Sequence, residues 1–197
     1  MKSKRSYKMS ERAKSQEETR QKIVEATMHL HEELGPRNTS IRAIADRAGV
    51  QRLTVYRHFP DETAVFQACT AHWLSLNPPP DPAAWAAITD PVERVRTALG
   101  AFYGYYSRTR KMWTVSFRDV GEVAALQQPM ADVAVFLASV ADDLLDAFGK
   151  DCDRDHLDPT IRHCLHFLTW QELEDQGLSD TRKLELVCAW LGPQGRS

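Results

Sequence analysis

With 197 residues, 43% of them hydrophobic and 26% charged, the chain has the composition of an ordinary globular protein, which excludes the disordered and fibrous classes. We expect a cytoplasmic protein with no membrane partner, because no apolar stretch approaches the roughly 18 to 20 residues of a membrane span and the first residues lack the apolar segment of a secretory signal. The charge is uneven: up to Pro60 there are 13 Lys and Arg against 7 Asp and Glu, and beyond it 12 against 20, so a polyanion would bind to the first part.

The N-terminal residues 1–18 are polar and charged, with almost no apolar periodicity, which predicts a flexible basic arm. A first helix is expected after this arm and is ended by Gly35 and Pro36, since glycine and proline commonly stop a helix. The residues that recur at helical spacing and predict this helix are Ile23, Ala26, Thr27, Leu30 and Leu34.

Two short helices are predicted next, joined by a tight turn. The first begins near Thr39 and Ser40, whose hydroxyls can cap its free N–H groups, and it buries Ile41, Ile44, Ala45 and Ala48. The turn is expected at Gly49, and the second helix runs from Gln51 to about Phe59, where Pro60 stops it. A further helix, capped by Asp61, is expected to continue through Trp73.

The rest of the chain is predicted to be helical after a proline-rich connection at residues 77–82, where a helix is excluded. Helices are expected at about 90–108, 110–118, 122–127, 130–149, 159–176 and 180–191. With no strand pattern or internal repeat, the fold class is all-α. We expect a three-helix DNA-binding domain at 19–64 and a larger helical effector-binding and dimerisation domain at 65–197.

The segment from Thr39 to Phe59 is the most informative part of the sequence, because two short helices joined by a glycine turn in a basic region indicate a helix-turn-helix motif. Such a helix fits the major groove of DNA, which is roughly 12 Å wide, where Arg and Gln can pair with base edges and an apolar side chain can meet a thymine methyl. The candidate DNA-binding residues are Thr39, Arg42, Gln51, Arg52, Leu53, Thr54, Tyr56, Arg57 and His58.

From Thr19 to Trp73 the sequence resembles the TetR family of transcriptional repressors. The resemblance rests on a helix followed by Thr-hydrophobic-Arg-x-Ile-Ala, on Ala-Gly-Val, and on Thr-Val-Tyr-x-x-Phe. A weaker resemblance, at 167–170 and from 177 to 191, is to the last two helices of that family, which build its dimer interface as a four-helix bundle. The resemblance implies a homodimer on a pseudo-palindromic double-stranded operator, released by a small hydrophobic or aromatic effector.

The resemblance also implies roles for individual residues. Thr54 and Tyr56 are expected to contact phosphates, and His58 to lie near the DNA backbone, while Phe59 anchors the core. Base edges are expected to be contacted by Gln51, Arg52 and Arg57. The sequence departs from the family pattern at Glu62, where a lysine is common; a carboxylate suits the start of a helix but repels phosphate.

Aromatic side chains on the later helices could line an effector pocket, because small-molecule sites are mostly apolar with a few polar groups. The family places its pocket among the corresponding helices. The candidate ligand-binding residues are Phe102, Tyr106, Trp113, Phe117, His163 and Phe167. The same aromatic side chains could instead only fill a core, which would leave a DNA-binding regulator without an effector, and the regulator could also be an activator.

An enzyme is not expected, since the sequence contains no phosphate-binding glycine loop, nucleophile motif or His-Glu-x-x-His motif. No cofactor is expected either. The acidic run at 151–155 imitates the start of a calcium loop, but His156 and Arg162 stand where glycine and glutamate are needed. The histidines and cysteines lack a recognised zinc spacing, so we predict no metal site, and the four cysteines are expected to be reduced.

Overall fold

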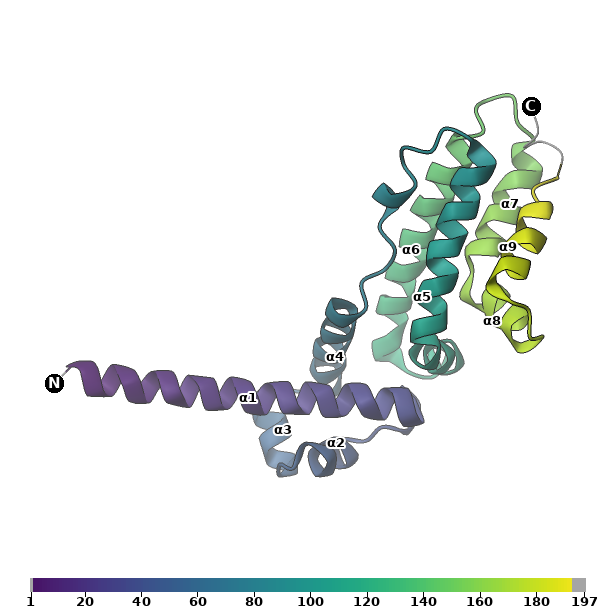
Figure 1. Ribbon diagram of the computed structural model, residues 1–197. Helices are drawn as coiled ribbons and strands as arrows, with labels where there is room; N and C mark the ends of the chain where they lie inside the picture. The colour runs from purple at the N-terminus through teal and green to yellow at the C-terminus, as the bar shows by residue number, and fades with distance from the viewer. Residues whose placement is uncertain (1, 193–197) are drawn as a thin grey trace. The chain divides into compact units, whose positions relative to one another are not determined.

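The computed structural model describes residues 2–192, and of residues 2–10 the backbone only. Throughout this part of the chain the regular elements are helical and no strand occurs, so the all-α prediction is confirmed (Figure 1). The α-helices are α1 (Lys2–Leu34), α2 (Ile41–Ala48), α3 (Arg52–His58), α4 (Glu62–Leu76), α5 (Pro91–Asp119), α6 (Ala124–Asp146), α7 (Arg154–Leu165), α8 (Phe167–Asp175) and α9 (Asp180–Ala189). Two short 3-10 helices, η1 (Pro36–Asn38) and η2 (Pro82–Ala84), lie in connections.

The chain divides into two compact units. The first unit holds the described residues up to Asn77 together with Thr114–Pro129. The second unit holds Pro78–Trp113 and the described residues from Met130 onwards. The division therefore falls inside α5 and α6, and all of α4 belongs to the first unit, whereas the sequence placed a single boundary at residue 64.

The first unit is built on α1, which packs against α2 and α4. The side chain of Ile23 is completely buried, and α1 ends where Gly35 adopts φ 87 and ψ 157, a region open to glycine, with Pro36 following. The helix α1 begins at Lys2, so the backbone of residues 2–18, which the sequence predicted as an arm outside the first helix, is helical. The buried core of this unit consists of Ile23, Val24, Leu30, Ile41, Ile44, Ala45, Val55, Phe59 and Val65.

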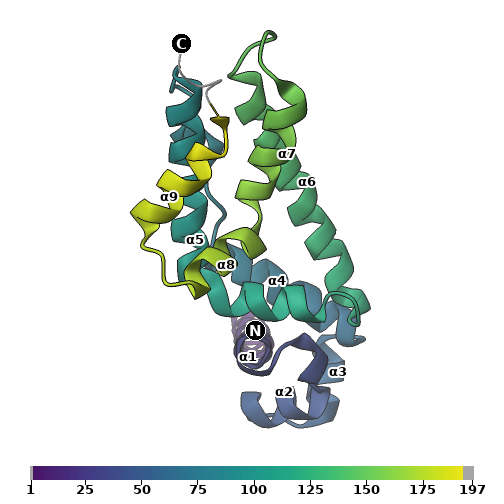
Figure 2. The same cartoon turned by 90° about the vertical axis from the view of Figure 1, so that its right-hand side faces the viewer.

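The second unit is held together by polar bonds as well as by apolar packing. The hydroxyl of Tyr103 donates to the carbonyl oxygen of Cys164 at 3.0 Å and that of Tyr106 to the carbonyl oxygen of Leu165 at 2.8 Å, which fixes α5 against the end of α7. An ion pair of 2.7 Å between Arg94 and Asp143 joins α5 to α6. Figure 2 shows α9 beside α5, with α6 and α7 on the other side of this unit.

The later helices differ from the prediction in three places: two predicted breaks are absent and one break was not predicted. The predicted helices 90–108 and 110–118 form one helix, α5, because the polar residues between them do not interrupt the backbone hydrogen bonds. Likewise α6 continues through Pro129, which sits inside the helix and lacks only its own N–H. Conversely, the predicted helix 159–176 is divided at His166, whose extended backbone (φ −73, ψ 135) separates α7 from α8.

Helix α6 also departs from the expectation that no stretch approaches a membrane span. It has 23 residues, and the mean hydropathy of its apolar stretch is 1.3, so by length and composition it is long and apolar enough to cross a membrane. Of this apolar stretch, 17% is buried inside the protein. A single helix of this kind is weak evidence for a membrane location, because helices of soluble proteins pass the same test.

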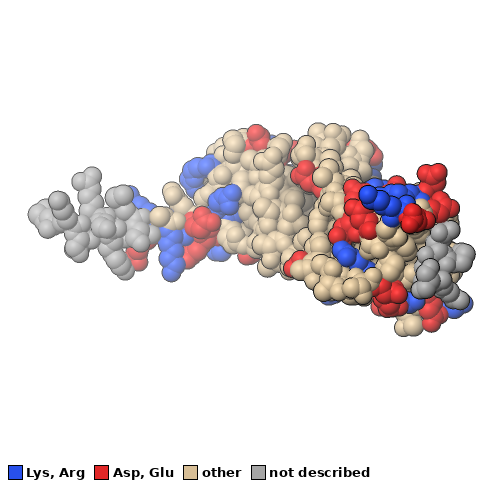
Figure 3. Space-filling view, turned by 90° about the horizontal axis from the view of Figure 1, so that it is seen from above, with Lys and Arg blue, Asp and Glu red and all other residues tan. Residues whose placement is uncertain are grey.

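Charge is distributed unevenly over the surface, in agreement with the acidic balance beyond Pro60. The face in Figure 3 shows more acidic than basic side chains over the part that carries the C-terminal end. Several of these charges on the second unit are paired, as in the ion pairs of Arg162 with Asp142 and Asp158.

Candidate nucleic-acid interface

The turn between α2 and α3 is closed by a glycine in the left-handed region. Gly49 has φ 67 and ψ 34, a conformation that costs other residues about 1 to 2 kcal/mol. The N–H of Val50 donates to the carbonyl oxygen of Ala45 at 3.0 Å, which satisfies the end of α2. At the other end of α2, the Ser40 Oγ accepts from the N–H of Ala43 at 3.2 Å, as the sequence predicted.

The orientation of α3 is fixed by its buried side. Val55 is completely buried and Phe59, just beyond the helix, is 2% exposed, and both belong to the core that α1, α2 and α4 form. The prediction that Phe59 is a core anchor is therefore confirmed. Because α3 has only two turns, these two anchors decide which of its side chains face outwards.

The opposite side of α3 presents a mixed polar and apolar face to solvent. Its exposed residues are Gln51, Arg52, Leu53, Tyr56 and Arg57, and the leucine side chain is 78% exposed. A leucine this exposed on a helix of seven residues has no packing role within the chain. The face offers amide and guanidinium groups for base edges, an apolar group for a thymine methyl and a phenol for a phosphate.

Two residues of this face are held together. The Arg52 Nη2 donates to the Tyr56 hydroxyl at 3.3 Å, and the Arg52 Cζ lies 5.6 Å from the centre of the tyrosine ring. The hydrogen bond to Tyr56 raises the pKa of Arg52, so the guanidinium stays charged. The pair reduces the freedom of a long side chain before any partner binds, which lowers the entropy lost on binding.

The remaining candidate residues lie at the edges of this face. Thr54 and His58 are half-buried, and the pKa of His58 is lowered by burial and then by the charges of Arg57 and Arg20, which favours the neutral ring. Thr39 is also half-buried, and its hydroxyl donates to the carbonyl oxygen of Gly35 at 2.9 Å.

Arg42, on the exposed side of α2, pairs loosely with Asp46 at 3.8 Å. A surface pair of this kind contributes little stability, so the arginine remains available to a phosphate. Arg42 and Thr39 both lie at the beginning of the helix-turn-helix, before α3.

One basic residue beside α3 was missed in the sequence. Arg20, on α1, lies with its Cζ 4.8 Å from the centre of the Phe59 ring and acts on the charge of His58. It precedes Phe59 by almost forty positions, so only the fold brings it there. The helical periodicity of α1 was a usable signal, because it places Arg20 one turn before the buried Ile23 and Val24.

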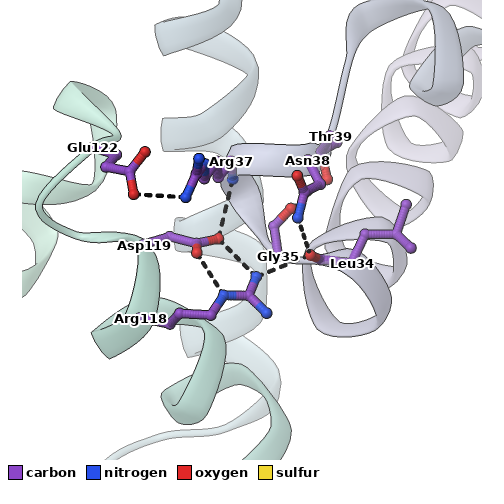
Figure 4. A network of polar contacts seen from close by, with 8 residues as sticks. All are labelled: Leu34, Gly35, Arg37, Asn38, Thr39, Arg118, Asp119 and Glu122. Atoms are coloured by element: carbon purple, nitrogen blue, oxygen red, sulfur yellow. Dashed lines mark hydrogen bonds and ion pairs between the residues drawn. The ribbon is translucent and has the colours of Figure 1, made fainter.

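A polar network fixes the segment between α1 and α2 (Figure 4). The carboxylate of Asp119, 1% exposed, accepts from Arg118 Nε at 2.7 Å and from the backbone N–H of Arg37 at 3.1 Å. Arg118 also donates to the carbonyl oxygen of Leu34 at 2.9 Å, and Arg37 pairs with Glu122 at 2.6 Å. The Arg118 guanidinium and the Arg37 N–H hold the pKa of Asp119 below its usual value.

The candidate effector residues do not gather in one place. Phe102, Tyr106, Trp113 and Phe167 are buried in the second unit and pack ring against ring, with the centres of Tyr106 and Phe167 5.4 Å apart. His163 is exposed and lies 6.1 Å from the ring of Trp190 instead. Phe117 is half-buried and belongs to the first unit.

Two further aromatic residues of the second unit were not selected in the sequence. Trp85 and Trp170 are completely buried, and neither indole Nε1 has a hydrogen-bond partner among the described residues. The rings of Trp85 and Phe102 are 6.1 Å apart, and those of Tyr106 and Trp170 are 5.9 Å apart, so both indoles adjoin the predicted cluster. A buried N–H donor without an acceptor lowers the stability of the folded protein, so these two indoles need an explanation.

Cysteine and histidine side chains form no metal centre in the described part of the chain, where no group of three or more His, Cys, Asp or Glu has the required proximity. The four cysteines are free thiols. Burial raises the pKa of Cys69 and of Cys164 to about 12, so both thiols stay protonated at neutral pH.

The glycine turn, the anchored α3 and its exposed polar face define a helix-turn-helix DNA-binding domain that is joined to a second helical unit. Residues 23–69 match the family model described as "Bacterial regulatory proteins, tetR family". This stretch contains both helices of the motif, the core residues that anchor α3 and the first half of α4. The match over this stretch confirms the resemblance to the TetR family found in the sequence.

Solved structures extend the likeness over most of the chain. A TetR-like transcriptional regulator from Rhodococcus sp. RHA1 is 17% identical, with 88% of this chain and 93% of that one covered and a TM-score of 0.60. A putative TetR-family transcriptional regulator from Syntrophomonas wolfei is 16% identical, with 92% and 96% covered and a TM-score of 0.62. No curated protein matches. The chain thus has the TetR-like fold, with a helix-turn-helix domain followed by a larger helical part.

Proposed function

We propose that the protein is a transcriptional repressor that binds a pseudo-palindromic operator as a homodimer and is released from it by a small apolar effector. The observation that carries the proposal is the outward face of α3, where Gln51, Arg52 and Tyr56 stand exposed on a helix anchored by buried Val55 and Phe59. Two such helices, about 34 to 36 Å apart in a dimer, would enter successive major grooves.

Single substitutions on this face test DNA recognition. Arg52→Ala removes a guanidinium suited to a guanine edge and should weaken operator binding by about 1 to 3 kcal/mol, or roughly 5- to 150-fold. Tyr56→Ala should weaken it too, because the tyrosine hydroxyl orients Arg52 and is placed for a phosphate. The measurement is fluorescence anisotropy with a labelled duplex selected from a random pool.

The matched control is Lys111→Ala, which removes an exposed cation from the second unit. It should leave affinity within about twofold, and all three variants should keep the helical content of the parent by circular dichroism. Wild-type affinity for both Arg52→Ala and Tyr56→Ala would refute the assignment of α3. The affinity of the parent should fall steeply with salt, because phosphate contacts release ions.

The homodimer is supported by apolar side chains exposed around the last two helices. Leu168 at the start of α8 is 46% exposed and Trp190 after α9 is 36% exposed, while buried Lys183, paired with Glu174 and Asp180, fixes the two helices to each other. Leu168→Glu should shift sedimentation from dimer to monomer and reduce operator affinity. An unchanged dimer would place the interface elsewhere.

The effector is supported by the aromatic cluster of the second unit. Its apolar side chains suit contact with an aromatic or aliphatic ligand, and the unpartnered indole N–H groups of Trp85 and Trp170 suit a ligand that carries an acceptor oxygen. Titration with a panel of aromatic esters, followed by tryptophan emission, should give a saturable change that Trp170→Phe reduces. A linear, unsaturable response across the panel would favour a regulator without an effector.

A further inference from the structure

The first unit contains a cavity that none of the functional residues discussed above accounts for. It has a volume of about 400 Å³, within the range of small-molecule sites, and lies among α1, η1, α2, α4 and the beginning of α6. Its lining residues are Thr27, His31, Pro36, Arg37, Thr39, Ile41, Ile44, Glu62, Thr63, Val65, Phe66, Glu122, Val123, Ala124 and Ala125. All of them belong to the first unit, so this cavity is separate from the aromatic cluster of the second.

The cavity has an apolar wall and a charged rim. Ile41, Ile44, Val65 and Phe66 are all buried core side chains that present part of their surface to it. At the rim, Arg37 pairs with Glu122 at 2.6 Å, and Glu62 adds a second carboxylate, which would repel an anion. Such a site favours a ligand with an apolar body and no net charge, because a charged ligand would have to break that ion pair or lose its own hydration.

Two buried polar side chains line this site, Thr27 and His31, and the hydroxyl of Thr27 already donates to the carbonyl oxygen of Ile23 at 2.8 Å. His31 is 6% exposed, and burial lowers the pKa of His31 to about 4, so the ring is neutral at pH 7. Its Nδ1 lies 3.7 Å from the Sγ of Cys69, a residue outside the cavity lining, whose thiol is protonated because burial raises its pKa to about 12. A protonated thiol can donate to Nδ1, and in that tautomer the ring proton lies on Nε2.

The Nε2 of His31 has no hydrogen-bond partner among the described residues, although the ring lines the cavity. We propose that this cavity is a binding site for a compact, uncharged, largely apolar molecule with one carbonyl oxygen, which accepts the hydrogen bond of His31 Nε2 while its body packs on Ile44 and Phe66. The site is distinct from the proposed effector pocket and does not depend on DNA binding.

A ligand in this cavity would touch two segments of the first unit, the entry to α2 and the beginning of α6. Thr39 and Ile41 lie at the entry to the helix-turn-helix, and Val123 and Ala125 come from the segment that the network around Asp119 ties to η1. Occupancy would therefore add contacts that join α2 to the beginning of α6. A second ligand site would let the DNA-binding unit respond without the second unit.

Acetophenone is a suitable probe, because it has an aromatic body and one carbonyl group, and ethylbenzene is its match without the acceptor. In the full chain, acetophenone should shift the amide NMR signals of Thr27, His31, Thr63 and Val123 in a saturable way. As a ligand this small, it should bind with a millimolar Kd. Ethylbenzene should bind at least fivefold more weakly, and His31→Phe should remove this preference.

Two variants of α6 separate the cavity from non-specific binding. Ala125→Phe fills the cavity from its rim, whereas Ala131→Phe adds the same ring at an exposed α6 position outside it. The first should abolish the saturable shifts and the second should retain them, with equal helical content in both. Shifts that persist in Ala125→Phe, or equal binding of ethylbenzene and acetophenone, would overturn the proposal, as would no shift up to the solubility limit.

Discussion

Replacement of Gly35 tests how tightly the end of α1 is fixed. Gly35 adopts φ 87 and ψ 157, a region that glycine occupies almost alone and that costs other residues about 1 to 3 kcal/mol. A Cβ at this position would also lie under 3.0 Å from Arg118 Nη2 and from Asp119 Oδ2. Gly35→Ala must therefore displace the buried carboxylate of Asp119 from its partners.

The loss of hydrogen bonds to a charged group costs about 1.5 to 3 kcal/mol, so together with the backbone contribution Gly35→Ala should destabilise the chain by about 2.5 to 6 kcal/mol. Gly49→Ala is the matched control, since Gly49 also has a positive φ of 67 but nothing lies within 4 Å of the added Cβ. It should cost only the backbone contribution, about 1 to 2 kcal/mol.

The assay is urea unfolding of the full chain, followed by circular dichroism and by hydrogen exchange of α1 and α2 amides, because the two units need not unfold together. Hydrogen exchange assigns any loss to the first unit. If Gly35→Ala is no more destabilising than Gly49→Ala, the close approach of Arg118 and Asp119 to Gly35 contributes nothing, and the reasoning is refuted.

Three further predictions concern stability. Burial lowers the pKa of His31 from 6.5 to about 4, so as the pH drops the unfolded chain binds the proton at a higher pH than the folded chain does. The free energy of unfolding should therefore fall by up to about 3 kcal/mol between pH 6.5 and pH 4. His31→Phe should flatten this part of the curve when urea midpoints are measured over a pH series. Val55→Ala should cost about 2 kcal/mol in the same assay, since Val55 is completely buried. Tyr106→Phe should cost about 1 kcal/mol, because it leaves the Leu165 carbonyl unpaired, whereas Tyr56→Phe on the surface should not change the urea midpoint.

The helix-turn-helix was predictable because its signals are local. The hydroxyl of Ser40, the left-handed Gly49 and the cap at Asp61, which accepts from the N–H of Ala64 at 2.8 Å, all act within a few residues of their own position. The buried Val55 and Phe59 follow from helical spacing in the same way. The orientation of α3 was therefore contained in about twenty residues of sequence.

The later helices were less predictable because proline and polar residues are ambiguous signals there. Pro129 and Pro159 each looked like a helix boundary, yet both lie inside helices whose packing compensates for one missing N–H. The break at His166 has no glycine or proline beside it. Its extended backbone lets the buried Phe167 and Trp170 start a new direction, which only the tertiary packing decides.

Contacts that join distant parts of the sequence were not predictable at all. The approach of Asp119 to Arg37 and the position of Arg20 over Phe59 both depend on how helices pack rather than on any motif. The same holds for the unpartnered indoles of Trp85 and Trp170, since a sequence shows that a tryptophan is apolar but not whether its N–H finds an acceptor.

Selection of bound sequences from a random pool of double-stranded DNA, with the purified full-length protein, tests the central claim most directly. Recovery of an inverted repeat with half-sites about 10 base pairs apart is the predicted result, because a symmetric pair of α3 helices would read two successive major grooves. Recovery of no common motif at low salt would contradict sequence-specific recognition through Gln51, Arg52, Leu53, Tyr56 and Arg57.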